Sequence, residues 1–405
     1  MSGEDHGSRV GEGGGPSVDV PRWRRRPRIL IVRRRYLGDT VLMEPFVRNL
    51  RAHWPDAWIS MVVDTPYVEA LATVEELDEI VEMPVRVPGL GENLRRWKAV
   101  LGAVAAAPFD LAFDFQRNER AQILLLVSRA PTRATLWPLG QPLRRRWVYT
   151  DVLKVTPEDD AALHTVDLSN RLLETLGVPA PFRVPILPVS EEQRASAQAI
   201  LRGHGVSARP GRPLLMVHPG SGAEARRWPP ARFAAVADHT VERHQASVVV
   251  LSGPREKELA ASVTQAMRES ATLVEATTSI PTLAALLAEA DLLLCNDSGP
   301  MHVAAAVGTP VCALYGAQSA VTWAPLGSAG HRTLQPPLPC GSECVAQGTC
   351  VPGDPMHSYC VRRVGVDDVV RTVDAQLGDG AASVRSVTRN TVRPGADSTS
   401  ISPRT

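Results

Sequence analysis

Short apolar runs alternate with longer amphipathic segments through most of the chain, beginning at residue 28. The runs are nearly continuous in hydrophobicity, as expected of strands buried on both faces of a parallel sheet. In the first half this pattern predicts strands at residues 28–32, 58–63, 79–81 and 109–115, and helices at 40–51, 68–71, 119–129 and 164–177. Pro45 either kinks the first helix or marks its true start. The alternation indicates an α/β fold with right-handed crossovers.

The second half repeats the alternation after a proline-rich stretch at residues 180–190. The predicted strands cover residues 214–217, 247–251, 272–274, 292–295 and 311–314, and the predicted helices cover 229–244, 255–268, 280–288 and 302–307. We therefore predict two domains, at residues 27–185 and 186–376. The leader 1–26 and the tail 377–405 are rich in Gly, Ser, Thr and Arg, and we expect both to be disordered.

Composition excludes few classes of function. The chain has 44 basic and 43 acidic residues, so net charge gives no reason to expect a nucleic-acid partner. It has neither a run of about eighteen apolar residues nor an apolar secretion signal, which predicts a cytoplasmic protein without a transmembrane segment. Four arginines within residues 22–26 leave a peripheral membrane contact open, although such a run is more commonly a solvated tail.

The strongest site signal lies in residues 292–316, where an apolar strand ends in Asn-Asp-Ser-Gly-Pro and a small-residue helix follows. A loop at the carboxyl end of a strand and the amino end of a helix suits phosphate. Ser298 and the backbone N–H groups around Gly299 are candidates for phosphate oxygens. The anionic Asp297 is better suited to sugar hydroxyls or to shaping the loop. His302 is a candidate pocket residue, although an isolated histidine is more commonly a satisfied core residue.

Two further loops follow predicted strands. Gly38 allows a tight turn and close approach of the backbone, and Asp39 is either a helix N-cap or an acid–base group. Position alone favours the cap. In the loop at residues 218–222, Ser221 and Gly222 form a phosphate-friendly but weak motif, and Arg226 adds a cation shortly after it.

These motifs occur in the order found in glycosyltransferase family 9, the heptosyltransferases of the lipopolysaccharide inner core, which the chain resembles over residues 28–374. The resemblance implies a GT-B fold of two facing Rossmann-like domains with parallel sheets, the first on the acceptor side and the second binding the donor nucleotide. It implies that Asp39 is the catalytic base and that Arg226, where relatives often carry lysine, meets the donor diphosphate. Donor-binding roles then fall on Gly38, Ser221, Gly222, Glu256, Asp297, Ser298, Gly299 and His302, with Glu256 on the nucleotide ribose.

The implied reaction is an inverting, metal-independent transfer of a sugar from a nucleotide donor to a hydroxyl of a glycan or other acceptor. Heptose from ADP-heptose is the expected donor sugar, and the product is a lipopolysaccharide core or another cell-envelope or natural-product glycan. No cofactor is expected for catalysis. Two alternatives stay open: a GT-B-like nucleotide-sugar epimerase and a non-catalytic sugar-nucleotide-binding protein. A Rossmann dehydrogenase is disfavoured because no predicted strand is followed by GxGxxG.

Cysteines cluster near the C-terminus, at Cys340, Cys344, Cys350 and Cys360. Four thiols in one Pro/Gly-rich loop permit a structural zinc, but the usual Cys-x2-Cys spacing is absent, so unligated thiols are an equal alternative. Cys295 and Cys312 lie in predicted strands, and we expect them in the core.

Overall fold

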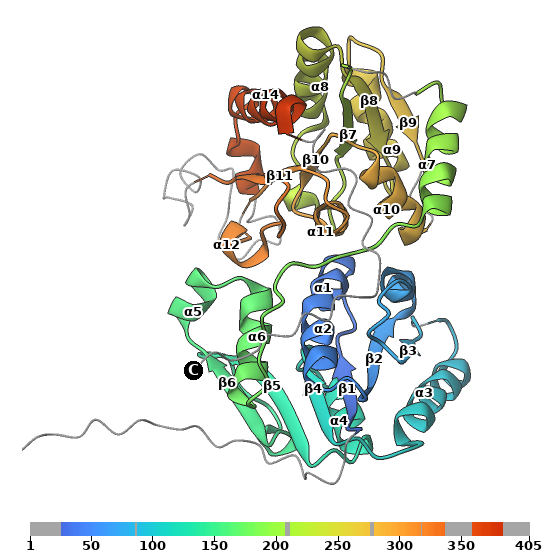
Figure 1. Cartoon of the computed structure of the whole chain (residues 1–405), viewed down its shortest axis with the longest axis vertical. Helices are drawn as coiled ribbons and strands as arrows, with labels where there is room; N and C mark the ends of the chain where they lie inside the picture. The colour runs from blue at the N-terminus through green and yellow to red at the C-terminus, as the bar shows by residue number, and fades with distance from the viewer. Residues whose placement is uncertain are drawn as a thin grey trace, which may run out of the picture.

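The computed structural model describes residues 26–85, 87–206, 211–275, 279–316, 318–336 and 359–383. It forms two lobes, each built on a parallel sheet flanked by helices (Figure 1). The chain passes from the first lobe to the second along an extended segment between α6 (Thr165–Thr175) and α7 (Glu191–Gly203). No helix in the described part of the chain has the length and apolar character needed to cross a membrane.

The first sheet has the strand order β3-β2-β1-β4-β5-β6, and its printed pairs are all parallel. The order reverses between β1 and β4, which makes this pair the topological switch point. The strands are β1 (Arg28–Val32), β2 (Trp58–Asp64), β3 (Glu79–Met83), β4 (Leu111–Asp114), β5 (Thr132–Pro138) and β6 (Asp151–Val155). The helices of this lobe are α1 (Leu37–Val41), α2 (Glu44–His53), η1 (Thr65–Leu71), α3 (Leu90–Ala105), α4 (Glu119–Val127), η2 (Arg146–Val148), α5 (Pro157–Ala162) and α6.

The second sheet has the order β12-β11-β10-β7-β8-β9, again parallel, with its switch point between β7 and β10. Its strands are β7 (Leu214–His218), β8 (Ser247–Leu251), β9 (Thr272–Val274), β10 (Leu292–Asn296), β11 (Val311–Leu314) and β12 (Arg332–Leu334). The helices are α7, η3 (Glu224–Arg226), α8 (Pro230–His244), α9 (Lys257–Ala266), α10 (Ile280–Ala288), α11 (Gly299–Ala306), α12 (Ala320–Trp323), η4 (Tyr359–Arg363) and α14 (Val366–Ser383). The two lobes therefore share one strand topology.

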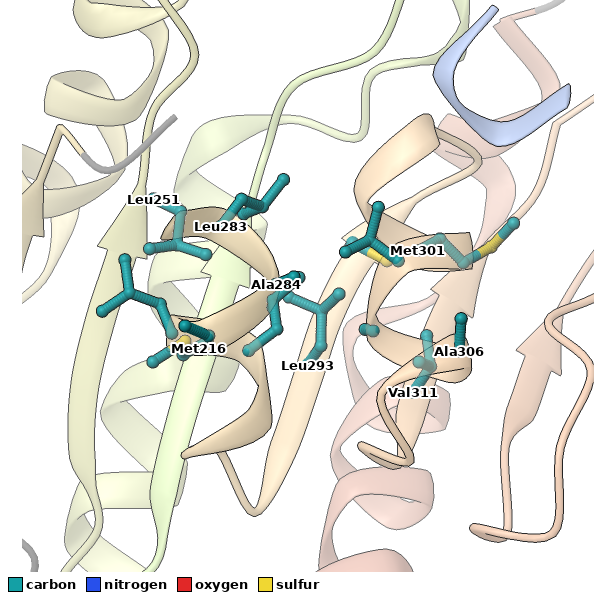
Figure 2. Close-up of a cluster of buried hydrophobic side chains, with 14 of the residues drawn as sticks. Met216, Leu251, Leu283, Ala284, Leu293, Met301, Ala306 and Val311 are labelled. Atoms are coloured by element: carbon teal, nitrogen blue, oxygen red, sulfur yellow. The ribbon is translucent and has the colours of Figure 1, made fainter. Parts of the chain in front are cut away.

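Hydrophobic clusters cover both faces of each sheet. In the second lobe, side chains of α10 and α11 pack on β7, β8, β10 and β11, including Met216, Leu283, Leu293 and Met301 (Figure 2). Val41 from α1 and Ala70 from η1 belong to the same cluster, although both come from the first lobe. The contact between the lobes is therefore an extension of an apolar core. Cys295 and Cys312 are fully buried in strands, which confirms their predicted place.

The structure differs from the predicted elements at several places. Pro45 marks the start of a separate helix, α2, because proline suits the first helical turn. The helix expected at residues 68–71 is a 3-10 helix, η1. Helix α14 continues to Ser383, past the expected start of a disordered tail at residue 377, because Leu377 is buried against the second-lobe core. The cysteine cluster falls outside the described residues except for Cys360 in η4, so the zinc site stays a prediction.

Candidate active site

The two switch points face each other through a close contact between α1 and α11. A Cβ atom added to Gly38 would lie 2.5 Å from His302 Cδ2, and one added to Gly299 would lie 2.8 Å from Leu37 Cβ. Real Cβ atoms do not approach other atoms this closely, so both positions require glycine for the lobes to meet as they do. Gly38 and Gly299 thus bring the loops after β1 and β10 together.

Hydrogen bonds on either side of this contact fix the arrangement of the lobes. His164 Nε2 lies 3.0 Å from the carbonyl oxygen of Ala324. Thr322 Oγ1 donates to the carbonyl of Asp160 at 3.0 Å, and Glu69 accepts from the backbone N–H of Ile280 at 3.0 Å. The last bond places a carboxylate at the amino end of α10, where the helix dipole stabilises negative charge.

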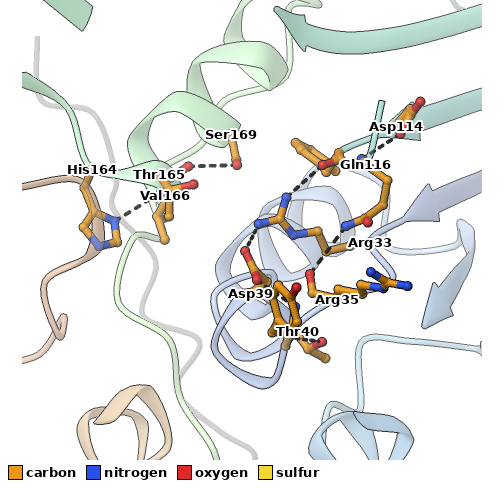
Figure 3. Close-up of polar contacts among 12 residues, drawn as sticks. Arg33, Arg35, Asp39, Thr40, Asp114, Gln116, His164, Thr165, Val166 and Ser169 are labelled. Carbon is orange, nitrogen blue, oxygen red and sulfur yellow. Dashed lines mark hydrogen bonds and ion pairs between the residues drawn. The ribbon is translucent and has the colours of Figure 1, made fainter. Parts of the chain in front are cut away.

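Asp39 projects from α1 with its carboxylate held at both oxygens (Figure 3). Oδ2 accepts from the backbone N–H of Tyr36 at 2.7 Å. Tyr36 is the N-cap of α1 and Asp39 is its third helical residue, so Asp39 makes the reciprocal bond of a capping box and is not itself the N-cap. Oδ1 is paired with the guanidinium of Arg33, and Arg33 Nη1 in turn donates to the carbonyl of Phe115 at 2.9 Å. Arg33 therefore ties the carboxylate to the end of β4, the neighbouring strand at the switch point. Arg33 is a site residue that sequence reasoning did not single out, and its place directly after the first predicted strand was the one signal that could have found it.

Across from α1, Arg226 and Asp297 form an ion pair, with Arg226 Nη1 3.1 Å from Asp297 Oδ2. Burial raises the pKa of Asp297, the neighbouring Arg226 opposes that rise, and the negative charge of Asp39 adds to it. Asp39 follows Gly38 and Asp297 lies two residues before Gly299, so the contact between α1 and α11 brings carboxylates from the two lobes toward one region. The predicted catalytic residues Asp39 and Arg226 are thus brought to the same place.

Two serines at this edge of the second sheet differ in what their hydroxyl groups contact. Ser221 Oγ donates to the backbone carbonyl of Asp297 at 3.0 Å, so it braces the loop. Ser298 Oγ is buried and has no hydrogen-bond partner among the described residues, although Ser298 is the N-cap of α11. An unpaired buried hydroxyl beside the amino end of a helix is suited to a ligand oxygen. The backbone of Gly222 lies close to Arg226, because a Cβ there would be 3.4 Å from Nη2.

Glu256 lies at the start of α9, beside the loop that follows β7. Its Oε2 lies 3.2 Å from His218 Nε2, and this hydrogen bond is the main reason that the pKa of Glu256 is lowered. A Cβ on Gly220 would lie only 2.2 Å from Glu256 Oε1, so a larger residue there would displace the carboxylate from its present position. His218, at the end of β7, is a site residue that sequence reasoning did not single out.

His302 is enclosed by the contact between the lobes. The side chain is buried beneath Gly38, and burial lowers its pKa to about 3, so the ring is neutral. Its Nδ1 has no partner among the described residues. This placement favours a packing role, and its predicted role in binding the donor stays a prediction.

The buried side chains of Asn296 and Trp228 hold the loops after β7 and β10 in place. The Asn296 side chain accepts from the backbone N–H of Trp228 at 3.0 Å and donates to the carbonyl of Pro219 at 2.7 Å. Trp228 is fully buried and donates from Nε1 to the carbonyl of Val364 at 3.0 Å. Trp228 therefore anchors the segment at residues 226–229 in the core and leaves Arg226 at the loop.

Two facing lobes of identical parallel topology, with charged loops at both switch points, define the GT-B class of fold. The family model described as glycosyltransferase family 9 (heptosyltransferase) matches residues 99–349. The chain belongs to this family, and it is a glycosyltransferase.

Individual relatives agree with this assignment. Lipopolysaccharide heptosyltransferase 3 of Escherichia coli K12 is 26% identical over 298 residues, covering 72% of this chain and 83% of that protein. A crystal structure of a family 9 glycosyltransferase from Veillonella parvula superposes with a TM-score of 0.73 at 25% identity, covering 87% of this chain and 98% of the other. E. coli heptosyltransferase WaaC with ADP shares the fold at a TM-score of 0.64 and 14% identity, covering 86% and 99% of the two chains.

Proposed function

We propose that this protein transfers heptose from ADP-heptose to a saccharide hydroxyl, with inversion and without a metal, during assembly of a lipopolysaccharide-type core glycan. The observation that carries the proposal is the close contact of α1 with α11, which brings Asp39 of the first lobe toward the Arg226–Asp297 ion pair of the second. The names of the relatives support the sugar and the acceptor, since lipopolysaccharide heptosyltransferases recur among them.

In this proposal Asp39 removes the proton from the acceptor hydroxyl as its oxygen attacks the anomeric carbon. Each carboxylate oxygen has two acceptor sites, so the bonds to Tyr36 and Arg33 leave capacity for the hydroxyl proton. Arg33 and the α1 backbone act by orienting the carboxylate. The bond that Asp39 accepts from the N-cap residue Tyr36 is therefore compatible with a role as base.

The leaving diphosphate is assigned to the second lobe. Arg226 supplies the cation, Ser298 Oγ supplies a free donor, and the amino end of α11 supplies backbone N–H groups. Asp297, which is paired with Arg226, is assigned to the sugar hydroxyls. Glu256 is assigned to the nucleotide ribose, because its carboxylate is held at the edge of the loop after β7 and is kept ionised by His218.

The test is incubation of the purified protein with a panel of nucleotide sugars and candidate saccharide acceptors, measuring released ADP, UDP or GDP. We expect ADP release from ADP-heptose only when acceptor is present, and we expect it to persist in EDTA. Turnover of donor without acceptor would instead indicate an epimerase, and donor binding without turnover would indicate a binding protein. A strict requirement for magnesium would refute the metal-independent mechanism.

The base assignment has its own test. Asp39→Asn keeps the size and the capping acceptor but removes the charge, so transfer should fall by about 10²–10⁴-fold while ADP-heptose binding is retained. Asp56→Asn, at an exposed position after α2, is the matched control and should transfer normally. Normal transfer by Asp39→Asn would show that another group is the base.

A further inference from the structure

Large apolar side chains that reach solvent are concentrated in the first lobe. Among the described residues, nine of the twelve exposed large hydrophobics lie there, two (Val184 and Ile186) lie in the segment that connects the lobes, and one, Val321, lies in the second lobe. Leu90 is 76% exposed and Trp147 is 67% exposed, so these residues are not simply the margin of a core. Five of the nine lie on α3, α4 and η2, which follows β5: Leu90, Leu94, Ile123, Leu126 and Trp147. Clustered exposed apolar residues mark an interaction surface.

The three elements form one continuous surface. Helices α3 and α4 cover the same face of the first sheet and pack on a common cluster (Figure 1). The guanidinium of Arg120 on α4 lies 5.9 Å from the ring centroid of Trp97 on α3. Arg145, in the loop after β5, pairs with Glu119 of α4 at 3.1 Å. We call this surface the basic–apolar face and define it by Leu90, Leu94, Arg120, Ile123, Leu126, Arg144, Arg145 and Trp147.

The basic–apolar face lies in the most cationic part of the chain. Residues 87–150 contain ten basic and four acidic residues, a net charge of +6, whereas the whole chain has a net charge of +1. Of the four acidic residues, Asp114 is buried, Asp110 accepts a hydrogen bond from the backbone N–H of Arg28, Glu92 pairs with Arg95 and Arg96, and Glu119 pairs with Arg145. The charge presented to solvent is therefore positive.

We propose that the basic–apolar face docks on the surface of an anionic lipid bilayer. Tryptophan and leucine suit the boundary between headgroups and acyl chains, and arginine suits lipid phosphate. A free polyanion would use the arginines but would leave the leucines exposed to water. A second copy of the chain would bring two positive faces together, which is electrostatically unfavourable.

The position of the basic–apolar face relative to Asp39 indicates how membrane docking would serve the proposed reaction. Helix α4 begins at the Asn118 cap, directly after β4, and β4 pairs with β1 in the register Val32↔Asp114. The end of β1 leads into α1 and Asp39. The beginning of α4 and the proposed base therefore follow adjacent strand ends at one edge of the sheet. A membrane-docked first lobe would present Asp39 close to the headgroups, where the saccharide of a lipid-anchored acceptor lies.

The test is sedimentation of the full-length protein with sucrose-loaded vesicles, which needs no donor and no turnover. We expect binding to phosphatidylcholine vesicles that contain about one third phosphatidylglycerol, weak binding to phosphatidylcholine alone, and loss of binding at high salt. Arg144→Gln with Arg145→Gln should weaken binding on the order of thirtyfold, since two charges are removed. Leu90→Gln with Leu94→Gln should weaken it at least about tenfold.

Matched controls come from the second lobe. Val321→Gln exchanges an exposed apolar residue and Arg243→Gln an exposed cation, and both should bind vesicles as the wild type does. Unchanged binding by the two double variants would overturn the proposal and would point to the arginines of the leader. Wild-type protein that fails to bind anionic vesicles would also overturn it, as would a dimer in solution that the Leu90/Leu94 variant dissociates. None of these outcomes depends on which sugar or base the enzyme uses.

Discussion

Replacing Gly38 with alanine tests the contact between the two lobes at its narrowest point. The new Cβ would lie 2.5 Å from His302 Cδ2 and 3.2 Å from Nε2. His302 is a buried residue of the second-lobe helix α11, so its ring cannot swing into solvent. Either α1 or α11 must move by about 1 Å, because ordinary carbon contacts begin at about 3.5 Å.

The cost follows from this overpacking. Forcing an extra methyl group into a well-packed contact destabilises a protein by about 1–3 kcal/mol. Asp39 follows Gly38 directly, so the same displacement moves the proposed base, and a misplacement of about 1 Å can slow a reaction about 10²-fold. We therefore expect Gly38→Ala to lower the midpoint of urea unfolding, followed by tryptophan fluorescence, and to slow sugar transfer by about two orders of magnitude.

Two further variants separate overpacking from other effects of the substitution. Gly102→Ala lies inside α3 with no atom within 4 Å of its added Cβ, so it should stabilise the protein by about 0.5–1 kcal/mol. Combining Gly38→Ala with His302→Ala removes the ring that the methyl group meets, so the double variant should be more stable than the sum of the single effects predicts, by at least about 1 kcal/mol. Strict additivity, or a Gly38→Ala protein as stable as the wild type, would refute the proposed contact.

Two other predictions concern buried polar side chains. Asn296→Ala leaves the N–H of Trp228 and a facing carbonyl without partners in the core, so it should cost about 2–4 kcal/mol in urea unfolding and lower donor affinity. Burial raises the pKa of Glu44 to about 7 in the folded state, against 4.5 for a free carboxyl, although Arg48 opposes the shift. A raised pKa of this kind means that stability is greatest below pH 4.5 and is lost as pH rises through 7. Glu44→Gln should therefore flatten this dependence and make the protein about 3 kcal/mol more stable than the wild type at pH 8, measured by urea unfolding at pH 5 and pH 8.

The sequence predicted best those elements that are buried on both faces. The helix at Ile280–Ala288 and the strand at Val311–Leu314 have the predicted bounds, since a continuous apolar run leaves little ambiguity. Strands β5 and β6 were missed because they lie at one side of the sheet, where Arg133 and Lys154 interrupt the apolar pattern. Helix α7 was also missed, although Ser190 and Gln193 form a capping box that is readable in the sequence.

The candidate site was predicted as a set of residues but not as a set of contacts. Gly38 was interpreted as a place where the backbone approaches a ligand, whereas in the structure it approaches His302. Ser221 was expected at phosphate, and its hydroxyl instead braces Asp297. Such pairings join residues about 80 to 260 positions apart, and no local pattern encodes which loops face each other across two lobes.

The ion pair between Asp297 and Arg226 leads to a last prediction, which concerns the effect of the Asp297 charge on ADP affinity and on kcat. Asp297 is paired with Arg226 and also interacts electrostatically with Asp39. A positive charge that develops on the sugar would therefore lie between two carboxylates. The departing diphosphate would compete with Asp297 for the guanidinium of Arg226.

Asp297→Asn should therefore separate binding from catalysis. Removing the carboxylate frees Arg226 and removes repulsion against phosphate, so ADP should bind more tightly by calorimetry. The same change removes a charge that favours the transition state, so kcat should fall by about 10-fold or more. Weaker ADP binding together with unchanged kcat would contradict the assignment of Asp297 to the sugar, because that result is expected only if the residue merely positions the diphosphate site.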